Sequence, residues 1–283
     1  MGANGQLGCD LTRVLSDKDT STLTHDDIEI GDYQTVKEVL GSIKPEIIIN
    51  TAAYHNVEEC EKNELEAFRI NSIGAKNLAV AAESIGATLI HISTDYVFDG
   101  KKNSPYIEHD TPNPLNTYGL SKLAGECYIR NNTGKYFIIR TTGLYGMHQC
   151  RAKSGNFIDT MLRLAREKKE IKVVNDQILS PTYTLDLAHK IAELADTDKY
   201  GLYHIVNSGF CSWYDFAKKI FEYSDIKADL QPVRSDEFPS SVKRPSYSVL
   251  DSINFELAGI GKPRKWTEAL MAYIEKRRQK NDQ

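Results

Sequence analysis

Short runs of apolar, often β-branched residues recur along this 283-residue chain, and stretches long enough for a helix separate them. Residues 46–50, 88–93 and 136–141 predict buried strands, and residues 64–85 and 119–131 carry apolar side chains at helical spacing. Strands that alternate with helices of this length form right-handed β-α-β units and a parallel sheet. A continuous apolar run such as residues 47–49 fits a strand that is covered on both faces. The sequence therefore predicts an α/β protein with a doubly wound, Rossmann-type parallel sheet.

The character of the sequence changes after about residue 206. Residues 213–223 and 266–276 predict helices, and residues 232–245 between them read as a loop. We therefore predict a sheet domain over residues 1–206, which keeps the helix at 156–166 and the strand at 172–174, and a smaller lobe over residues 207–283. Residues 143–156 are expected to contribute to the lobe as well. Doubly wound folds bind ligands at the carboxyl edge of the sheet, so we expect the lobe to cover that edge.

Charge and hydropathy exclude several classes of protein. The net charge is -4 and no basic run occurs, so the sequence lacks the positive stripe that binds nucleic acid. The longest apolar runs are the length of a strand, and no secretion signal is visible. Five cysteines are scattered without C-x-x-C spacing, which argues against disulfides and against a metal site. We expect a cytoplasmic protein that binds neither nucleic acid, membrane nor metal.

Three glycines open the chain at regular spacing, Gly2, Gly5 and Gly8, and a helical pattern follows them. Glycines before a helix allow a tight turn and let a pyrophosphate approach backbone N–H groups. Such a loop normally follows a hydrophobic strand, but this sequence begins at the loop itself. We therefore expect a sheet that lacks its usual first strand. A start codon assigned a few residues too late would explain this, and a truncated gene product is the alternative.

A tyrosine and a lysine, Tyr118 and Lys122, are four residues apart and so lie on one face of a predicted helix. A nearby ammonium stabilises a phenolate, which lowers the pKa of the phenol toward the working pH. Such a tyrosine can protonate a carbonyl oxygen while a nicotinamide delivers hydride. Thr94 ends the strand predicted at 88–93, where a hydroxyl points into the ligand crevice. The glycine loop, the hydroxyl and the Tyr/Lys pair, in this order, predict a dehydrogenase.

At these residues the chain resembles the extended short-chain dehydrogenases, and among them the dTDP-4-dehydrorhamnose reductases. The resemblance covers almost the whole chain. It includes residues 2–8, 45–54, Asn71, 93–100, 118–122 and the later segments 140–141, 156–157, 176–177, 180–183, 201–204, 212–214 and 243–245. The later segments distinguish this family from other extended members. The resemblance implies reduction of the 4-keto group of a dTDP-4-keto-6-deoxy sugar with NADPH or NADH, for surface polysaccharide, by a monomer or homodimer.

The resemblance also assigns roles to residues, with Thr94, Tyr118 and Lys122 as the catalytic set. Besides Tyr118 and Lys122, it places the dinucleotide along Gly2, Gly5, Gln6, Leu7, Asp27, Ile28, Ala52, Ala53, Tyr54 and Asn71. It places the nucleotide sugar against Thr94, Asp95, Tyr96, Asn156 and Arg244, of which the last would hold the diphosphate. The segment at 24–26 offers neither a clear acid for a ribose diol nor an arginine for a 2′-phosphate, so NADH and NADPH both stay open.

Four positions depart from the family pattern, namely His55, Glu58, Gly143 and Leu179. The family usually has threonine and aspartate at the first two, tryptophan at the third and glycine at the fourth. Residues 147–153 form an unusual insertion. These changes are expected near the sugar, so the reductase chemistry is a firmer prediction than the sugar. Two alternatives remain, a nucleotide-sugar epimerase and a non-catalytic, NADP-binding regulatory subunit of the same family.

Overall fold

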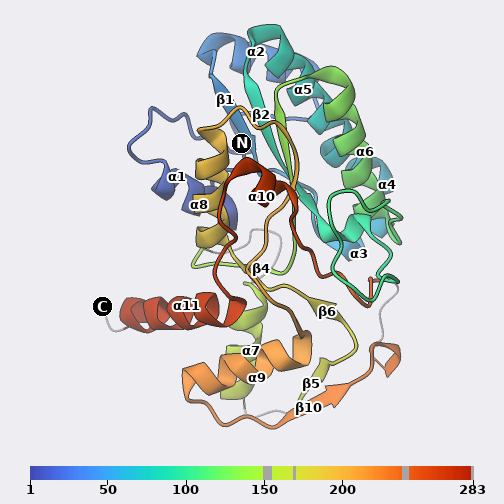
Figure 1. Cartoon of the computed structure of the whole chain (residues 1–283), viewed down its shortest axis with the longest axis vertical. Coiled ribbons are helices and arrows are strands. Elements are labelled where there is room, and N and C mark those ends of the chain that lie inside the picture. The colour runs from blue at the N-terminus through green and yellow to red at the C-terminus, as the bar shows by residue number, and fades with distance from the viewer. Residues whose placement is uncertain (149–154, 168–169, 238–241, 282–283) are drawn as a thin grey trace.

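A four-stranded parallel sheet forms the centre of the molecule (Figure 1). The computed structural model describes residues 1–148, 155–167, 170–237 and 242–281. The strands lie in the order β1 (Ile47–Asn50), β2 (Thr88–Thr94), β3 (Tyr136–Thr141) and β8 (Gly201–His204). Ile47 pairs with Thr88, and Leu89 pairs with Tyr136, so all carboxyl ends meet at one edge. The three strands expected from their apolar runs are confirmed.

Helices cover both faces of this sheet, as the doubly wound prediction requires (Figure 1). On one face lie α2 (Tyr33–Ile43), α5 (Gly74–Ile85) and α6 (Thr117–Asn132), packed around side chains such as Leu78 and Ile129. On the other lie α1 (Gln6–Val14) and α8 (Thr184–Ala195), packed around Leu11, Ile139 and Leu187. Each face therefore has its own hydrophobic core.

In the part of the chain that the structure describes, β1 is an edge strand and the glycine loop follows no strand. The first residues lie beside the carboxyl end of β1. The α-amino group of Met1 donates to Ile49 O (2.7 Å), and Met1 O accepts from Thr51 N (3.2 Å). Ala3 N donates to Leu23 O (3.1 Å). These bonds hold the glycine loop at the carboxyl edge of the sheet.

The predicted helical stretch at 64–85 is interrupted by a π-helical turn, at Arg69–Ile73, between α4 (Glu64–Phe68) and α5. The turn presents Asn71 and Ser72 to α6, where they bond Ser121 Oγ (3.0 Å) and Ser121 O (2.7 Å). The approach is close, because a Cβ on Gly125 of α6 would lie 2.4 Å from Asn71 O. Such π turns often occur at functional sites. Here the turn fixes the helix that carries Tyr118 and Lys122.

A smaller lobe lies across the carboxyl edge of the sheet (Figure 1). Its strands β5 (Ile171–Val174) and β10 (Leu230–Val233) are parallel, and α7 (Phe157–Arg166), α9 (Trp213–Ser224) and α11 (Trp266–Asn281) share one core with them. The two late helices are confirmed, but residues 230–233 form a strand where the sequence indicated a loop from 232. The packing also joins α7 and β5 to the lobe. The predicted division at residue 206 stays a prediction.

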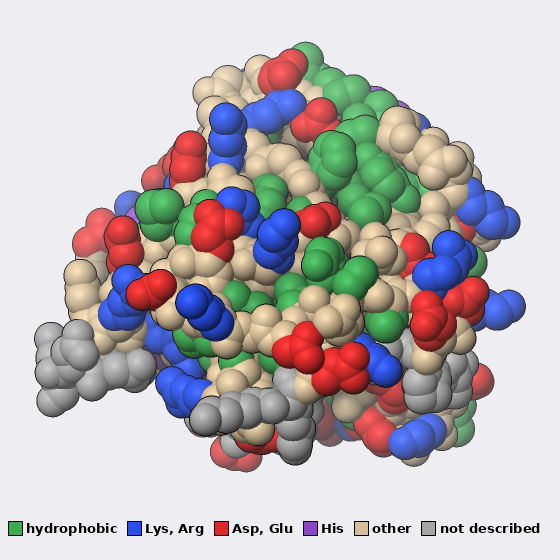
Figure 2. All heavy atoms as spheres, turned by 90° about the horizontal axis from the view of Figure 1, so that it is seen from below, with side chains coloured by type: hydrophobic (Ala, Val, Ile, Leu, Met, Phe, Trp, Pro, Cys, Tyr) green, Lys and Arg blue, Asp and Glu red, His purple; other side chains and the backbone are tan. Residues whose placement is uncertain are grey.

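Short elements complete the described chain. They are α3 (Val57–Lys62), the 3-10 turns η2 (Asp95–Val97) and η3 (Ser235–Glu237), the strands β4 (Leu144–Tyr145), β6 (Ile178–Leu179), β7 (Thr182–Tyr183) and β9 (Cys211–Ser212), and α10 (Asn254–Ala258). On the face in Figure 2, basic side chains stand beside acidic ones, as the small net charge suggests. Among the described residues, no helix has the length and apolar character to span a membrane.

Candidate active site

A cavity of about 1460 Å³ opens at the carboxyl edge of the sheet. Residues at or just beyond the ends of β1, β2 and β3 line it, among them Ala52, Thr94 and Thr141, and Trp213 and Arg244 line it from later in the chain. This is the crevice in which doubly wound folds bind ligands. The lobe and the sheet together therefore form the candidate site.

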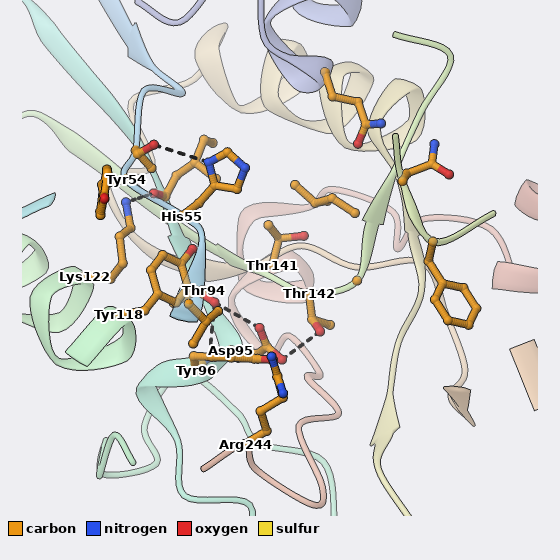
Figure 3. Close-up of a pocket in the computed structure, with 18 of the residues that line it drawn as sticks. Tyr54, His55, Thr94, Asp95, Tyr96, Tyr118, Lys122, Thr141, Thr142 and Arg244 are labelled. Atoms are coloured by element: carbon orange, nitrogen blue, oxygen red, sulfur yellow. Dashed lines mark hydrogen bonds between the residues drawn. The ribbon is translucent and has the colours of Figure 1, made fainter. Parts of the chain in front are cut away.

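The fold brings Thr94, Tyr118 and Lys122 together in this cavity (Figure 3). Thr94 ends β2, and the other two lie on the first turns of α6. Burial raises the pKa of Tyr118 above its ordinary value, and a hydrogen bond with the Thr94 hydroxyl lowers it by less. The Tyr118 ring meets the ring of Tyr96 edge-on, with centroids 5.8 Å apart. The pKa therefore moves away from the working pH, opposite to the direction expected from the Tyr/Lys spacing, and the phenol stays protonated next to a second hydroxyl.

The side chain of Lys122 is almost fully buried, with 1% of its surface exposed. Its Nζ donates to Ile92 O (2.6 Å) and lies 3.0 Å from His91 Nε2. Burial lowers the pKa of Lys122 to about 8, although the Glu126 carboxylate acts in the opposite direction. The lysine therefore titrates close to neutral pH.

A buried carboxylate, Asp95, ties three hydroxyls together beneath the site. Oδ1 accepts from Thr94 (3.0 Å) and Oδ2 accepts from Thr142 (2.7 Å), and both bonds are drawn in Figure 3. Burial raises the pKa of Asp95 to about 6, against hydrogen bonds from Ser248 and the two threonines. This network fixes the hydroxyl of Thr94 against Tyr118.

An ion pair includes one of the residues that line the cavity, Arg244. The Arg244 guanidinium forms an ion pair with Glu58 and a hydrogen bond with Tyr96. Burial raises the pKa of Tyr96 to about 12, with a smaller contribution from Asp95. Arg244 thus presents a partly neutralised positive charge to a ligand.

The glycine loop is packed too tightly for larger residues. A Cβ on Gly2 (φ +71°) would lie 2.7 Å from Thr51 Oγ1, and a Cβ on Gly8 would lie 2.2 Å from Gly2 O. The helix α1 begins after Gly5 without a side-chain cap, and Gly5, Gln6 and Leu7 line the cavity. Uncapped N–H groups at a helix start bind phosphates. The loop therefore fits the pyrophosphate of a dinucleotide.

Most of the site residues predicted from the sequence line the cavity, and two do not. The cavity residues are Gly2, Gly5, Gln6, Leu7, Ile28, Ala52, Ala53, Tyr54, Thr94, Asp95, Tyr96, Tyr118, Lys122, Asn156 and Arg244. Asp27 is exposed and accepts from Thr24 N and Oγ1, both at 2.8 Å. Asn71 is buried behind the wall, where it bonds Tyr54 N and O, both at 2.9 Å. These two residues shape the site from outside the cavity.

Asn156 lines the cavity and also caps the start of α7. Its side-chain oxygen accepts from Asp159 N (3.0 Å) in the capping box of α7, and Nδ2 donates to Gly146 O (3.0 Å). Its contact with substrate therefore stays a prediction.

Three of the unusual positions, His55, Gly143 and Leu179, line the cavity. Leu179 fills the space beside Gly143 (φ +58°), because a Cβ there would lie 2.7 Å from Leu179 Cδ1. The fourth, Glu58, holds Arg244. Residues 149–153 of the unusual insertion lie outside the described residues.

The sequence did not indicate the polar side chains behind the catalytic ones. His91 and Asn50 stand behind Lys122, and Glu126 forms a buried ion pair with Arg140, with bonds of 2.9 and 2.6 Å. The signal that could have found His91, Asn50 and Arg140 is a polar residue within an otherwise apolar, doubly covered strand.

Comparison with known proteins gives the same identification. A family model described as "RmlD substrate binding domain" matches residues 1–279. The spore coat polysaccharide biosynthesis protein SpsK of Bacillus subtilis is 44% identical, over 98% of this chain and 96% of its own length. The dTDP-4-dehydrorhamnose reductase of Escherichia coli is 38% identical, over 90% and 89%. A crystal structure of that reductase from Bacillus anthracis, in complex with NADP, has 43% identity and a TM-score of 0.93 over 97% of both chains. This chain therefore belongs to the dTDP-4-dehydrorhamnose reductase family.

Proposed function

We propose that this protein reduces the 4-keto group of a dTDP-4-keto-6-deoxy sugar, dTDP-4-dehydrorhamnose, to give dTDP-rhamnose for surface polysaccharide. The observation that carries the proposal is the contact between the Tyr118 phenol and the Thr94 hydroxyl inside the cavity, near the uncapped start of α1. The names of the full-length relatives support the substrate class. A cytoplasmic location and a monomeric or homodimeric state belong to the same proposal.

In the proposed reaction the cofactor supplies hydride to the carbonyl carbon of the sugar. Tyr118 gives its phenolic proton to the carbonyl oxygen as that oxygen gains charge. The raised pKa of Tyr118 suits a group that must carry its proton at neutral pH. In this structure the Thr94 hydroxyl donates its one proton to Asp95 Oδ1, so it would turn that proton to the same carbonyl oxygen when the sugar binds. The protonated form of Lys122 stabilises the phenolate that is left.

The cofactor is NADPH or NADH. The relative from Bacillus anthracis binds NADP, and this chain presents the same fold over nearly its whole length. We propose that the backbone at Gly5, Gln6 and Leu7 holds the pyrophosphate and that Lys122 donates to the nicotinamide ribose. Ala52 and Ala53 form the wall beside that ribose.

The nucleotide sugar enters beside Arg244, which we propose as the diphosphate ligand. A guanidinium fork matches phosphate oxygens well. Because Glu58 already bonds Arg244, a bound diphosphate must either share Arg244 with the Glu58 carboxylate or displace that carboxylate. Glu58→Gln is therefore expected to lower KM for the dTDP sugar and to change kcat little.

The direct test is consumption of NADPH and of NADH with a panel of dTDP-4-keto sugars. We expect stoichiometric consumption with dTDP-4-dehydrorhamnose. Conversion of the sugar without loss of reduced cofactor would indicate an epimerase, and cofactor binding without turnover of any sugar would indicate a regulatory subunit. Either result would overturn the proposal.

The variant Tyr118→Phe tests the assignment of the proton donor. We expect it to lose at least about 100-fold in kcat, the usual contribution of a general acid, while NADP affinity stays within a few-fold. Tyr128→Phe is the matched control, since Tyr128 lies on the same helix and outside the cavity. Full activity in Tyr118→Phe would remove Tyr118 from the mechanism.

A further inference from the structure

Behind Lys122 lies a short chain of buried polar groups that the proposed reaction does not use. His91 of β2 is 1% exposed, and its two ring nitrogens face different partners. Nε2 lies 3.0 Å from Lys122 Nζ, and Nδ1 lies 3.1 Å from Asn50 Nδ2 at the end of β1. The first contact joins α6 to β2 and the second joins β2 to β1, so their geometry is fixed by the fold.

The orientation of the Asn50 amide determines which group donates and which accepts in each of these two contacts. Asn50 Oδ1 accepts a hydrogen bond from Ala52 N (3.1 Å), so the NH₂ group faces His91. The reversed amide would place its NH₂ group against the N–H of Ala52, two donors face to face. With the amide as observed, His91 Nδ1 must accept a hydrogen bond from Asn50 Nδ2.

A neutral imidazole that accepts at Nδ1 carries its own proton on Nε2. His91 is neutral, because burial, the larger of the two causes, holds its pKa well below the ordinary value. The Nε2–H group therefore points at Lys122 Nζ. An ammonium has three donors and no acceptor, so a protonated Lys122 would oppose this N–H. An amine offers a lone pair to His91 and still donates to Ile92 O (2.6 Å).

We propose that His91, oriented by Asn50, is a positioning residue that holds Lys122 as a neutral amine in the cofactor-free protein. The inference rests on the proposed role of Lys122, since it concerns the charge that this lysine brings to the reaction. Lys122 would take its proton from solvent when cofactor binding turns Nζ toward the ribose. The catalytic charge would then appear together with the cofactor.

The charges near Lys122 act in opposite directions. Burial lowers the pKa of Lys122 to about 8, and Glu126, one turn further along α6, partly offsets that fall. Burial alone therefore leaves the ammonium as the main form at pH 7, and the N–H of His91 is the contact that would favour the amine. The Glu126 carboxylate is already shared by Arg140 of β3 and by Ser93 of β2. Other titratable groups that act on this part of the cavity, through Tyr118, are Asp95 and Tyr96 of η2 and Cys60 of α3.

The first test reads the position of the ring proton directly. In the cofactor-free full chain labelled with ¹⁵N at its seven histidines, long-range ¹H–¹⁵N spectra distinguish the two neutral tautomers. We expect His91 to carry its proton on Nε2. His204 is an internal control with the opposite tautomer, because its Nδ1 lies 3.0 Å from the carbonyl oxygens of Tyr106 and Asp251. A proton on Nδ1 of His91, or on both nitrogens, would overturn the proposal.

The variant Asn50→Asp exchanges donors and acceptors in the contacts of His91 with almost no change in the shape of the side chain. A carboxylate oxygen in place of Nδ2 requires an N–H at His91 Nδ1, which turns Nε2 into an acceptor for a Lys122 ammonium. We expect the midpoint of the pH dependence of NADP affinity, measured by fluorescence titration, to rise by about one unit or more. An unchanged or lower midpoint would contradict the inference.

The two readouts separate this inference from the proposed function. The tautomer of the wild-type chain is measured without cofactor or sugar, so it decides the matter even where Asn50→Asp fails to fold. A chain that shows the Nε2–H tautomer but turns over no sugar would refute the proposed reaction and leave the role of His91 in place.

Discussion

The buried ion pair between Glu126 and Arg140 offers a quantitative test of how the site is supported. Both side chains are fully enclosed, with 0% and 1% exposed, between α6 and β3. Glu126→Gln keeps the side-chain shape and an oxygen that can accept from Ser93 and from Arg140 Nε. It removes the charge and sets an NH₂ donor against Arg140 Nη2, so it leaves a buried guanidinium that cannot shed its proton.

The expected loss follows from this geometry. Breaking a buried pair by removing one charge costs about 3–5 kcal/mol. For a chain of this size, that corresponds to a fall in Tm of roughly 6–20 °C. The double variant Glu126→Leu with Arg140→Met removes both charges and leaves the Ser93 hydroxyl without its acceptor, at a cost of about 1–3 kcal/mol. We therefore expect the double variant to be more stable than Glu126→Gln.

Urea unfolding at 25 °C, followed by circular dichroism, measures these differences. The matched control is Glu66→Gln, because Glu66 also binds an arginine through two oxygens, at 2.7 and 2.8 Å, but is 40% exposed. Exposed pairs contribute at most about 1 kcal/mol. A loss below about 1 kcal/mol for Glu126→Gln, or a double variant less stable than it, would refute the reasoning.

Two further predictions concern Gly8 of the glycine loop and Gly143 of the cavity wall. Gly8→Ala places a Cβ 2.2 Å from Gly2 O, so we expect the free energy of unfolding to fall by about 1–3 kcal/mol and NADP to bind at least tenfold more weakly. The control is Gly41→Ala, in open space on α2, which should instead stabilise the protein by about 0.5–1 kcal/mol. Gly143→Ala meets Leu179 at positive φ and should cost about 1–2 kcal/mol, measured by thermal unfolding. In a Leu179→Ala background the steric part of that cost should disappear, and additive effects would contradict the contact.

The order of the sequence elements already determined much of this protein. Apolar runs at β1, β2 and β3 with helical stretches between them specify a parallel sheet, because alternation along the chain and burial on both faces allow few other arrangements. The same runs locate Thr94 at a strand end and place Tyr118 and Lys122 on one helix face. The loop predicted from residue 232 was wrong at β10, since only pairing with β5 makes Leu230–Val233 a strand.

What only the tertiary structure decided is how the catalytic groups are supported. His91 meets Asn50 across 41 residues and Lys122 across 31, and no local pattern encodes such contacts. Nor does the sequence show that Leu179 fills the space beside Gly143, 36 positions earlier in the chain. Residue types and their spacing in the sequence indicate which groups can react. Their charge and direction depend on burial and on partners that the fold alone brings within reach.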